Sequence, residues 1–380
     1  MPFEPSHAVQ RILAQSQRPG SPPGAGIIRL VSGDPDFATP EYIRRALIDA
    51  IEAGYTHYAD GQGDPELRAA LAEQASRGAD VTPTQVVVTH GGSGALASAL
   101  LATVNPGDRI LLPEPTYSAY ADVAVMAGAE PVFVPQTADF HLDLDALEAA
   151  AGGARLVVLC HPCNPTGVVY RLDELQALGE LAERHDLLVL SDEAYDHIVY
   201  DGVAFTSTLA VPALRDRLIY CQTFSKTYAM TGWRLGYLIA PPDVAAAASR
   251  IHRSLVGPLN SATQRAALAA VTTPSDWPER MRREYQERRE LVVQLLADVP
   301  GVSMVPPEGA FYAFIHYDAP VSSRQVAALA REHGVAIRSG SEYGPSGEGY
   351  VRVAFSSSRA DITEGLMRLR SLLAGLDGQG

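Results

Sequence analysis

Lysine is almost absent from this sequence. Lys226 is the only lysine in 380 residues; of the 30 Lys and Arg side chains in total, all the others are arginines. Arginine replaces lysine in surface ion pairs, but it keeps its proton at neutral pH and forms no imine. A single retained amine therefore indicates Schiff-base chemistry, a phosphate contact or a buried ion pair. The alternative is that codon usage removed lysines and left one by chance.

Cysteine, long apolar runs and excess positive charge are lacking too. Three cysteines are too few, and too odd in number, for a disulfide scaffold. No apolar run approaches the roughly 20 residues of a membrane span, and the first residues do not form the apolar stretch of a signal peptide. The formal net charge of −14 argues against nucleic acid or an anionic membrane as a partner. These absences predict a soluble cytoplasmic protein.

Cys160 and Cys163 have the C-x-x-C spacing of redox and metal sites, with His161 between them. A redox motif would open a helix in a thioredoxin-like unit, and a zinc site would need a fourth ligand nearby. Neither pattern is evident. The spacing is therefore interpreted as chance placement at a strand end, and no metal site is predicted.

The residues around Lys226 select among the uses of its amine. A P-loop would place glycines before the lysine, and residues 221–225 include none. Arg234 follows on the same short segment, between Trp233 and Gly236. An amine that forms imines and a guanidinium that binds anions thus lie close in sequence. The pairing predicts an aldehyde cofactor that carries a phosphate.

Strands and helices alternate through the middle of the chain. Helices are predicted at 40–52, 95–103, 118–126 and 173–185. Apolar runs predict strands at 85–89, 109–112, 131–134, 155–160, 187–191, 218–222 and 235–240. Alternation of this kind implies crossover connections and a largely parallel sheet, and fully apolar strands imply helices on both of its faces. The sequence predicts an α/β fold.

The two ends of the chain form a different pattern. Residues 1–26 indicate an arm with one weak helix at 9–16, followed by a short apolar run at 27–30. A long helix at 277–297 precedes strands at 310–316 and 350–355 and helices at 323–333 and from Ala360 onward. We therefore expect a large domain at 41–284 and a smaller α+β domain at 285–380, to which part of the arm at 1–40 belongs.

Polar motifs follow several of the predicted strands. Ligands gather beyond the carboxyl ends of parallel strands, so these motifs predict one binding site. A glycine-rich turn at 90–94 offers backbone N–H groups to a phosphate, and Tyr117 offers a ring for stacking. Asp192 directly follows an apolar strand, where a carboxylate needs a partner. The alternatives are a plain strand-to-helix turn for the glycines and a helix N-cap for Asp192.

Together these motifs resemble the class I/II aminotransferases, pyridoxal-phosphate enzymes of fold type I. The match follows the chain in order over nearly its whole length. The motifs that carry it are Gly33 with Pro35-Asp36-Phe37, Tyr58 ahead of Glu66-Leu67-Arg68, Asn164-Pro165-Thr166-Gly167, Asp192-Glu193-Ala194-Tyr195, Ser225-Lys226, Gly232-Trp233-Arg234-Leu235-Gly236 and Val351-Arg352-Val353-Ala354-Phe355.

The resemblance implies that Lys226 forms an internal aldimine with pyridoxal phosphate. Once displaced by the substrate amine, it would be the base that moves the Cα proton, on the way to a pyridoxamine intermediate. A free lysine has a pKa of about 10.4, whereas a base at neutral pH needs roughly 7 to 8. Burial beside Arg234 and the cofactor would lower the pKa of Lys226.

The resemblance also implies how the cofactor ring is held. Asp192 would pair with the pyridine nitrogen and keep it protonated, which makes the ring an electron sink. Asn164 and Tyr195 would hydrogen-bond the ring oxygen, and Tyr117 would stack on the ring.

The phosphate, by the same resemblance, would be held by Ser225, Arg234 and the backbone at Gly92 and Ser93. Tyr58 resembles the family tyrosine that reaches the phosphate in the neighbouring subunit. A homodimer with shared active sites follows from that likeness.

Arg352 resembles the arginine that receives the substrate α-carboxylate in a bidentate fork, with Asn164 beside it and the backbone of Gly33 close by. Two departures from the family pattern stand out. Ser93-Gly94 replaces larger polar residues in the phosphate turn, and Arg338 stands where the family often has an apolar residue or proline. Arg338 marks either a substrate contact or an exposed loop, and the loop is the favoured interpretation.

The predicted function is an aminotransferase that exchanges an amino group between an L-amino acid and a 2-oxo acid. A pyridoxal-phosphate lyase or cyclase on the same scaffold is the alternative, because removal of the α-proton is common to all three. A ligand-sensing module of a transcription regulator is disfavoured, since no helix-turn-helix pattern precedes the domain. A dicarboxylate substrate would need a second cation, for which Arg29, Arg253 and Arg338 are candidates, and the sequence does not choose among them.

Overall fold

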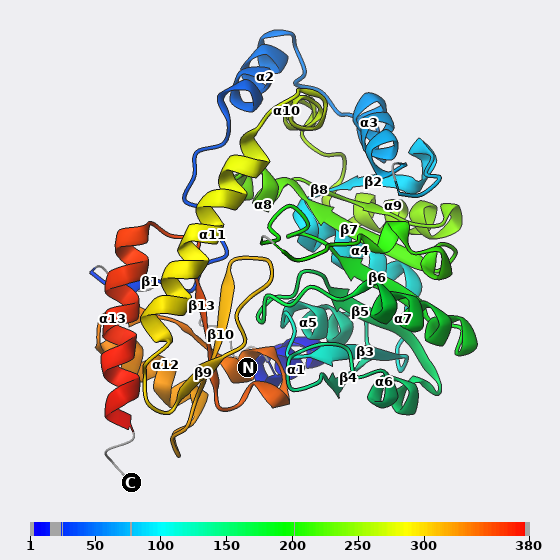
Figure 1. Cartoon of the computed structure of the whole chain (residues 1–380). Coiled ribbons are helices and arrows are strands. Elements are labelled where there is room, and N and C mark those ends of the chain that lie inside the picture. The colour runs from blue at the N-terminus through cyan, green and yellow to red at the C-terminus, as the bar shows by residue number, and fades with distance from the viewer. Residues whose placement is uncertain (1–3, 16–23, 25, 77, 201, 377–380) are drawn as a thin grey trace.

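A computed structural model of the chain describes residues 4–15, 24, 26–76, 78–200 and 202–376. Two sheets lie side by side, with the larger on the right in Figure 1. The larger has seven strands in the order β2 (Val86–Thr89), β8 (Gly236–Ile239), β7 (Leu218–Thr223), β6 (Leu188–Asp192), β5 (Ala154–Cys160), β3 (Arg109–Glu114) and β4 (Glu130–Pro135).

The seven-stranded sheet is mostly parallel, as predicted. Only β8 runs antiparallel to both of its neighbours, β2 and β7. The reason lies in the connection from β7 to β8, which holds only the short helix α8 (Phe224–Thr227) and the turn η4 (Thr231–Trp233). To make β8 parallel to β7, the chain would need a crossover connection, usually a helix, that returns along the full length of the strand. The predicted α/β class is confirmed, and this short connection places Lys226 just beyond the carboxyl end of β7.

Helices pack on the large sheet because its strands are apolar on both faces. For example, α4 contacts β7 and β8, α9 contacts β2, and α5 contacts β3 and β4. The helices of this part are α2 (Glu41–Glu52), α3 (Pro65–Ala75), α4 (Gly91–Thr103), α5 (Ala119–Met126), α6 (Leu144–Ala151), α7 (Leu172–Arg184), α9 (Pro242–Val256) and α10 (Ser261–Thr272).

Four of these helices, α3, α6, α9 and α10, have no counterpart in the sequence analysis. All four are rich in alanine. Alanine is the best helix former, but it is only weakly hydrophobic, so α3 and α10 show little apolar periodicity. Pattern reading therefore missed helices that propensity alone would have favoured.

The smaller sheet has four antiparallel strands in the order β12 (Arg338–Ser339), β13 (Tyr350–Ala354), β10 (Tyr312–Tyr317) and β9 (Val302–Met304). Beside it lie α11 (Trp277–Leu296), α12 (Ser323–Glu332) and α13 (Arg359–Leu376), and β1 (Ile28–Arg29) pairs with β11 (Val335–Ala336). The helix α1 (His7–Gln15) contacts α5 of the larger part.

The long helix α11 runs from the top of the molecule to its lower left, beside both parts (Figure 1). The predicted domain boundary after residue 284 falls inside this continuous helix. Among the described residues, no helix has the length and apolar character that crossing a membrane requires.

Candidate active site

A cavity of about 430 Å³ lies between the two sheets. One wall comes from the carboxyl ends of β5, β6 and β7 and from the start of α4, and the other comes from β10, β12 and β13. The lining includes most of the predicted site residues: Gly33, Gly92, Ser93, Tyr117, Asn164, Asp192, Tyr195, Ser225, Lys226, Arg234 and Arg352. The fold thus brings together residues that are scattered from one end of the chain to the other.

Lys226 extends into this cavity from α8. The side chain of Thr223, the N-cap of this helix, accepts a hydrogen bond from the N–H of Ser225 and fixes the turn (3.2 Å). The Lys226 Nζ donates to the backbone oxygen of Gly33 at 2.6 Å. Burial lowers the pKa of Lys226 to about 8, and Arg234 also lowers it. The predicted direction of this shift is confirmed.

Asp192 is the last residue of β6 and faces the same cavity. Its carboxylate accepts hydrogen bonds from the Tyr120 hydroxyl at 2.9 Å and from the Ala194 N–H at 3.2 Å. Burial raises the pKa of Asp192, while the hydrogen bond from Tyr120 opposes that rise. A carboxylate placed in this way favours a cationic partner, because a positive charge would offset the cost of its desolvation.

The start of α4 forms a cradle for an anion. The helix begins at Gly91, not at Ala95 as predicted, so the glycine-rich turn is its first turn. The first N–H groups of a helix have no partner within it, and together with the helix dipole they attract phosphate. Ser225 and Arg234 line the cavity beside Gly92.

Close packing explains the glycines of this cradle. A Cβ on Gly91 would lie 2.8 Å from the Arg234 guanidinium. A Cβ on Gly236 would lie 2.7 Å from backbone atoms of Gln222 and Gly91. Arg234 itself has φ 55°, in the left-handed region, and its guanidinium donates to the Thr231 oxygen at 3.0 Å. Glycine at these two positions lets the first turn of α4 approach both Arg234 and the backbone at the start of β8.

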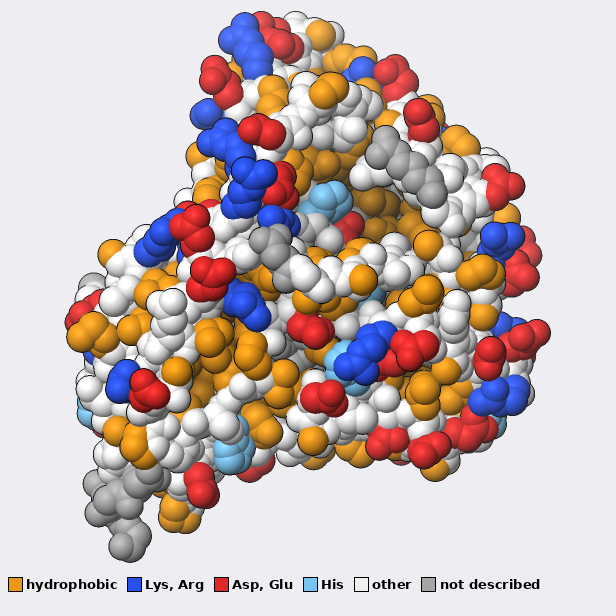
Figure 2. All heavy atoms as spheres, viewed as in Figure 1, with side chains coloured by type: hydrophobic (Ala, Val, Ile, Leu, Met, Phe, Trp, Pro, Cys, Tyr) orange, Lys and Arg blue, Asp and Glu red, His pale blue; other side chains and the backbone are white. Residues whose placement is uncertain are grey.

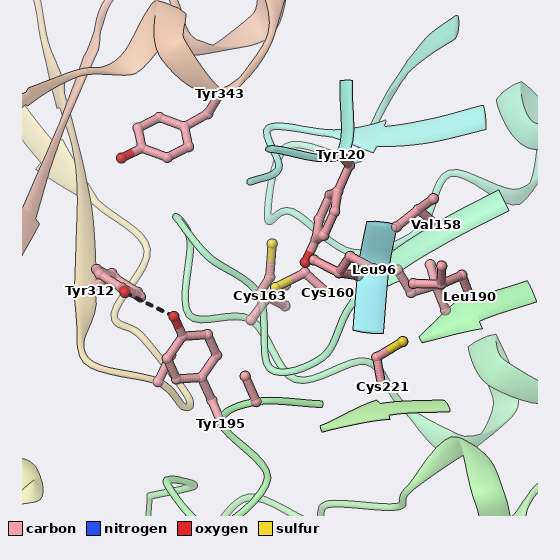
Figure 3. Packing of buried hydrophobic residues seen from close by; sticks show 14 of the residues in the cluster. Leu96, Tyr120, Val158, Cys160, Cys163, Leu190, Tyr195, Cys221, Tyr312 and Tyr343 are labelled. Atoms are coloured by element: carbon pink, nitrogen blue, oxygen red, sulfur yellow. Dashed lines mark hydrogen bonds between the residues drawn. The ribbon is translucent and has the colours of Figure 1, made fainter. Parts of the chain in front are cut away.

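Tyrosine rings surround the middle of the cavity (Figure 3). Tyr117 packs edge to face on Tyr120, with ring centroids 5.5 Å apart. The hydroxyl of Tyr195, in the turn after β6, is hydrogen-bonded at 2.9 Å to that of Tyr312, in β10 of the smaller sheet. Cys160 ends β5 at the edge of the cavity. All three cysteines are free and buried, and the described residues hold no cluster that suits a metal ion.

Arg352 projects from β13, in the opposite wall, into the cavity and is only 4% exposed. Its guanidinium donates to Asn164 Oδ1 at 3.1 Å and to the backbone oxygen of Val31. The buried Nε has no hydrogen-bond partner among the described residues. Tyr312 and Tyr343 pack against the guanidinium, at 4.4 and 5.2 Å from Cζ to each ring centroid. A buried guanidinium with an unused donor is suited to a carboxylate ligand.

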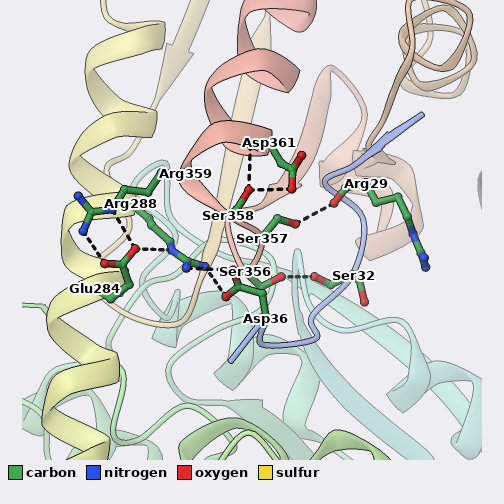
Figure 4. A network of polar contacts seen from close by, with 10 residues as sticks. All are labelled: Arg29, Ser32, Asp36, Glu284, Arg288, Ser356, Ser357, Ser358, Arg359 and Asp361. Carbon is green, nitrogen blue, oxygen red and sulfur yellow. Dashed lines mark hydrogen bonds and ion pairs between the residues drawn. The ribbon is translucent and has the colours of Figure 1, made fainter. Parts of the chain in front are cut away.

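Gly33 lies where only bare backbone fits. A Cβ on this residue would fall 2.2 Å from the Tyr312 hydroxyl. The loop that carries it is held at Asp36, whose carboxylate takes a bidentate pair from Arg288 at 2.8 and 3.1 Å (Figure 4). Arg288 in turn pairs with Glu284 on its own helix α11. The network ties the loop to the long helix and thereby places Gly33 beside Lys226.

Arg338 corrects one interpretation of the sequence. It lies in β12, lines the cavity, and its side chain is 24% exposed, so the exposed-loop interpretation is wrong. Its guanidinium pairs with Glu342 at 3.2 Å. Arg29 and Arg253, the other candidate cations, are exposed and do not line the cavity.

Tyr58 is 91% exposed and lies outside the cavity of its own chain. Its predicted reach into a neighbouring subunit stays a prediction. Conversely, the cavity contains Tyr120, Tyr312 and Glu342, which the sequence analysis did not identify. Tyr312 sits in an apolar strand and Tyr120 in an apolar helix, so nothing in the local pattern set them apart from core residues.

The arrangement fits an aldehyde cofactor with a phosphate and a ring nitrogen. The lowered pKa of the Lys226 amine suits an aldehyde, and the helix N-terminus beside Arg234 suits a phosphate. The buried carboxylate of Asp192 suits a protonated ring nitrogen. The cavity also has the volume typical of small-molecule sites, about 300 to 1,000 Å³.

Comparison with known proteins agrees with this chemistry. The family model of aminotransferase class I and II matches residues 25–369. An aromatic-amino-acid aminotransferase of Thermococcus litoralis is 37% identical over 358 residues, 92% of each chain. An aspartate aminotransferase of Pyrococcus horikoshii is 33% identical over 358 residues, 92% of this chain and 91% of the other.

A solved structure agrees as well. The aromatic aminotransferase from Pyrococcus horikoshii superposes with a TM-score of 0.90 at 33% identity and covers 96% of this chain and 98% of its own. With the fold, the cavity and these likenesses in agreement, the chain belongs to the class I and II aminotransferase family, as a pyridoxal-phosphate-dependent aminotransferase of fold type I.

Proposed function

We propose that Lys226 is the catalytic residue of this aminotransferase, which exchanges an amino group between an amino acid and a 2-oxo acid. The observation that carries the proposal is the placement of the chain's only lysine in the cavity, with a pKa of about 8. Lys226 holds the cofactor until the substrate amine replaces it. Near neutral pH a useful fraction of the freed amine is neutral, so it takes and returns the proton at the substrate Cα.

Pyridoxal phosphate, when bound, supplies an aromatic ring that takes up the electron pair left at Cα. Asp192 keeps the ring nitrogen protonated, and Tyr120 holds that carboxylate in place. Asn164 and Tyr195 donate to the ring oxygen, and Tyr117 stacks on the ring. Gly92, Ser93, Ser225 and Arg234 hold the phosphate.

Arg352 binds the substrate α-carboxylate, with Asn164 and the Gly33 backbone at its side. Support comes from its burial, its unpaired Nε, and the two tyrosine rings that restrict its orientation. A fixed guanidinium positions the Cα–H bond relative to Lys226, and positioning of this kind lowers the barrier by avoiding an entropy cost at the moment of reaction.

The absorbance spectrum of the cofactor-loaded protein tests this function. We expect single amino acids to convert the cofactor band, and a 2-oxo acid to restore it. Lys226→Ala should lack this response while it still binds the cofactor through the phosphate site. Release of ammonia or a cyclised product without conversion of the band would contradict the proposal and favour a lyase or cyclase.

A homodimer with shared active sites is the second part of the proposal. Apolar side chains are exposed on α2, after it and at the end of α9: Ile48, Ile51, Tyr55, Tyr58, Leu255 and Val256. Helix α10 packs on α2, and the two helices form the top of the molecule in Figure 1. Figure 2, in the same view, shows a hollow with hydrophobic side chains below them. Surface of this kind supports contact with a second copy, whose cofactor phosphate Tyr58 would reach. Light scattering should give the mass of a dimer, and Tyr58→Phe should weaken cofactor binding without dissociating it.

The proposal also covers the domain boundaries and the cellular location. We place the large domain at residues 41–284 and the small domain at 285–380, with part of 1–40 joining the latter; the pairing of β1 with β11 supports this. We also propose a cytoplasmic location, which three free cysteines support. Limited proteolysis tests the first assignment and cell fractionation the second.

A further inference from the structure

The cavity holds a second guanidinium that the proposed chemistry does not use. In the ladder between β12 and β13, Arg338 lies directly opposite Arg352. Directly opposite residues point to the same face of a sheet, with Cα atoms roughly 5 Å apart. Both side chains line the cavity. A group bound at Arg338 therefore lies a few bonds from a carboxylate bound at Arg352.

Glu342 accompanies this second guanidinium. Its side chain is only 6% exposed, and its Oε2 accepts from an Arg338 nitrogen at 3.2 Å. Glu342 also lines an adjoining cavity of about 390 Å³, which shares Tyr117, Ser118 and Tyr343 with the first. Glu342 is the only described side chain that pairs with Arg338, and the contact uses one nitrogen of a guanidinium that carries five N–H donors. Arg338 thus keeps donors for a ligand.

We propose that Arg338 and Glu342 form a side-chain subsite that selects a carboxamide, so that asparagine-type or glutamine-type amino acids are preferred amino donors. The inference rests on the proposed function, in which Arg352 binds the α-carboxylate. An amide has a carbonyl oxygen that accepts from Arg338 and an NH₂ group that donates to Glu342. It can hydrogen-bond to both members of the pair at once, and it adds no charge.

The same pair disfavours the two other common kinds of side chain. A carboxylate bound to Arg338 would approach the buried carboxylate of Glu342, and two like charges on one guanidinium repel each other. An apolar side chain would cover the remaining Arg338 donors without pairing them. Selection by a repulsive neighbour together with an attractive one is a general route to specificity.

Carboxylic acids that lack an amino group bind without reacting, so they measure the selectivity of binding apart from catalysis. Succinamate, succinate and isocaproate share a carboxylate for Arg352 and end in an amide, a carboxylate and a branched alkyl group, respectively. Calorimetry on the cofactor-loaded enzyme should show succinamate binding at least about tenfold more tightly than each of the others, since a site built to hydrogen-bond a group discriminates strongly against its absence. Succinate binding as tight as succinamate would overturn the subsite and indicate that Glu342 moves aside.

Variants of similar size that lack the charge test the role of each partner. Glu342→Gln keeps the shape and removes the repulsion, so succinate should gain on succinamate by about tenfold or more. Arg338→Met should bring the three affinities together. Glu364→Gln, which alters an exposed i,i+4 pair with Arg368, is the matched control and should change nothing. An unchanged ratio of affinities in Glu342→Gln would overturn the proposal.

Different results would contradict the proposed aminotransferase function and the proposed carboxamide subsite. If none of the three acids binds and no amino acid converts the cofactor band, the proposed function is wrong and the subsite falls with it. If amino acids react but asparagine has no advantage over aspartate in kcat/KM, only the subsite is wrong.

Discussion

The two walls of the cavity differ in how they present their functional groups. On the wall of the large sheet, Asp192, Lys226 and the first turn of α4 lie at or just beyond strand ends. On the wall of the small sheet, Arg352, Arg338 and Tyr312 lie within strands, and their place depends on which residues pair across the ladder. Residues at strand ends form short contiguous motifs that can be recognised in the sequence. Cross-strand neighbours are distant in sequence and can be identified only once the pairing of the strands is known.

The walls also differ in how they respond to pH. The large-sheet wall contains the titratable amine of Lys226, with its pKa lowered to about 8. The small-sheet wall presents guanidiniums that keep their charge at every accessible pH. The first wall is therefore suited to moving protons and the second to holding anions, and the predictions below test that division.

The largest effect is expected on the proton-transfer side. Lys226→Ala should lower kcat by at least about 10⁴-fold, because it removes both the covalent attachment and the base. Lys226→Arg keeps the positive charge and should be equally inactive. Steady-state transamination measures both. Activity retained by Lys226→Arg would show that the amine's charge, and not its chemistry, is what matters.

A smaller loss is expected on the anion-binding side. Arg352→Met should lower kcat/KM by about 10²- to 10³-fold, as expected for the loss of a buried charge-assisted pair. The spectrum of the bound cofactor should stay as in the parent protein, since Arg352 does not hold the cofactor. Arg253→Met, on an exposed side chain outside the cavity, is the control. Equal losses in the two variants would argue against a specific carboxylate site.

A change in stability is expected where the loop between the walls is anchored. Arg288 is 5% exposed on its side chain and pairs with Asp36 and Glu284. Arg288→Met should lower the free energy of unfolding by about 2 to 3 kcal/mol, below the full value for a buried pair because Asp36 is partly exposed. Urea unfolding measures the loss. Arg45→Met, in the exposed pair with Asp49, should cost about 0.5 kcal/mol or less.

The smallest effect concerns pH. The folded-state pKa of Lys226 is about 8, below its ordinary value of 10.5, so the amine is protonated and unreactive below that pH and neutral above it. Acylation of Lys226 in the cofactor-free protein should rise about tenfold for each pH unit up to that midpoint and then level off. Peptide mapping measures the acylation of Lys226 alone, because the chain has no other lysine side chain. A midpoint near that of the urea-unfolded chain would show that burial does not lower the pKa.

Much of the fold followed from pattern alone. The alternation of apolar runs indicated the mostly parallel sheet, and the motifs at its strand ends led to the cavity now seen around Lys226 and Asp192. The reversed direction of β8 did not follow, because strand direction depends on how the connection folds and not on the strand's own residues. Tyr58 shows the same limit for assembly, since an exposed ring on one chain acquires a role only beside a second chain.

The sequence by itself determined the kind of chemistry. A glycine-rich turn, an aspartate after an apolar strand and a single lysine follow one another along the chain. Few other functions require that combination, and each feature acts through local backbone geometry. Only the tertiary structure decided what faces the substrate. Arg338 joined Arg352 because antiparallel pairing placed them opposite each other, and Glu342 came to Arg338 through the turn that follows β12. The cross-strand pairing depends on how the small sheet folds, so no local pattern records it.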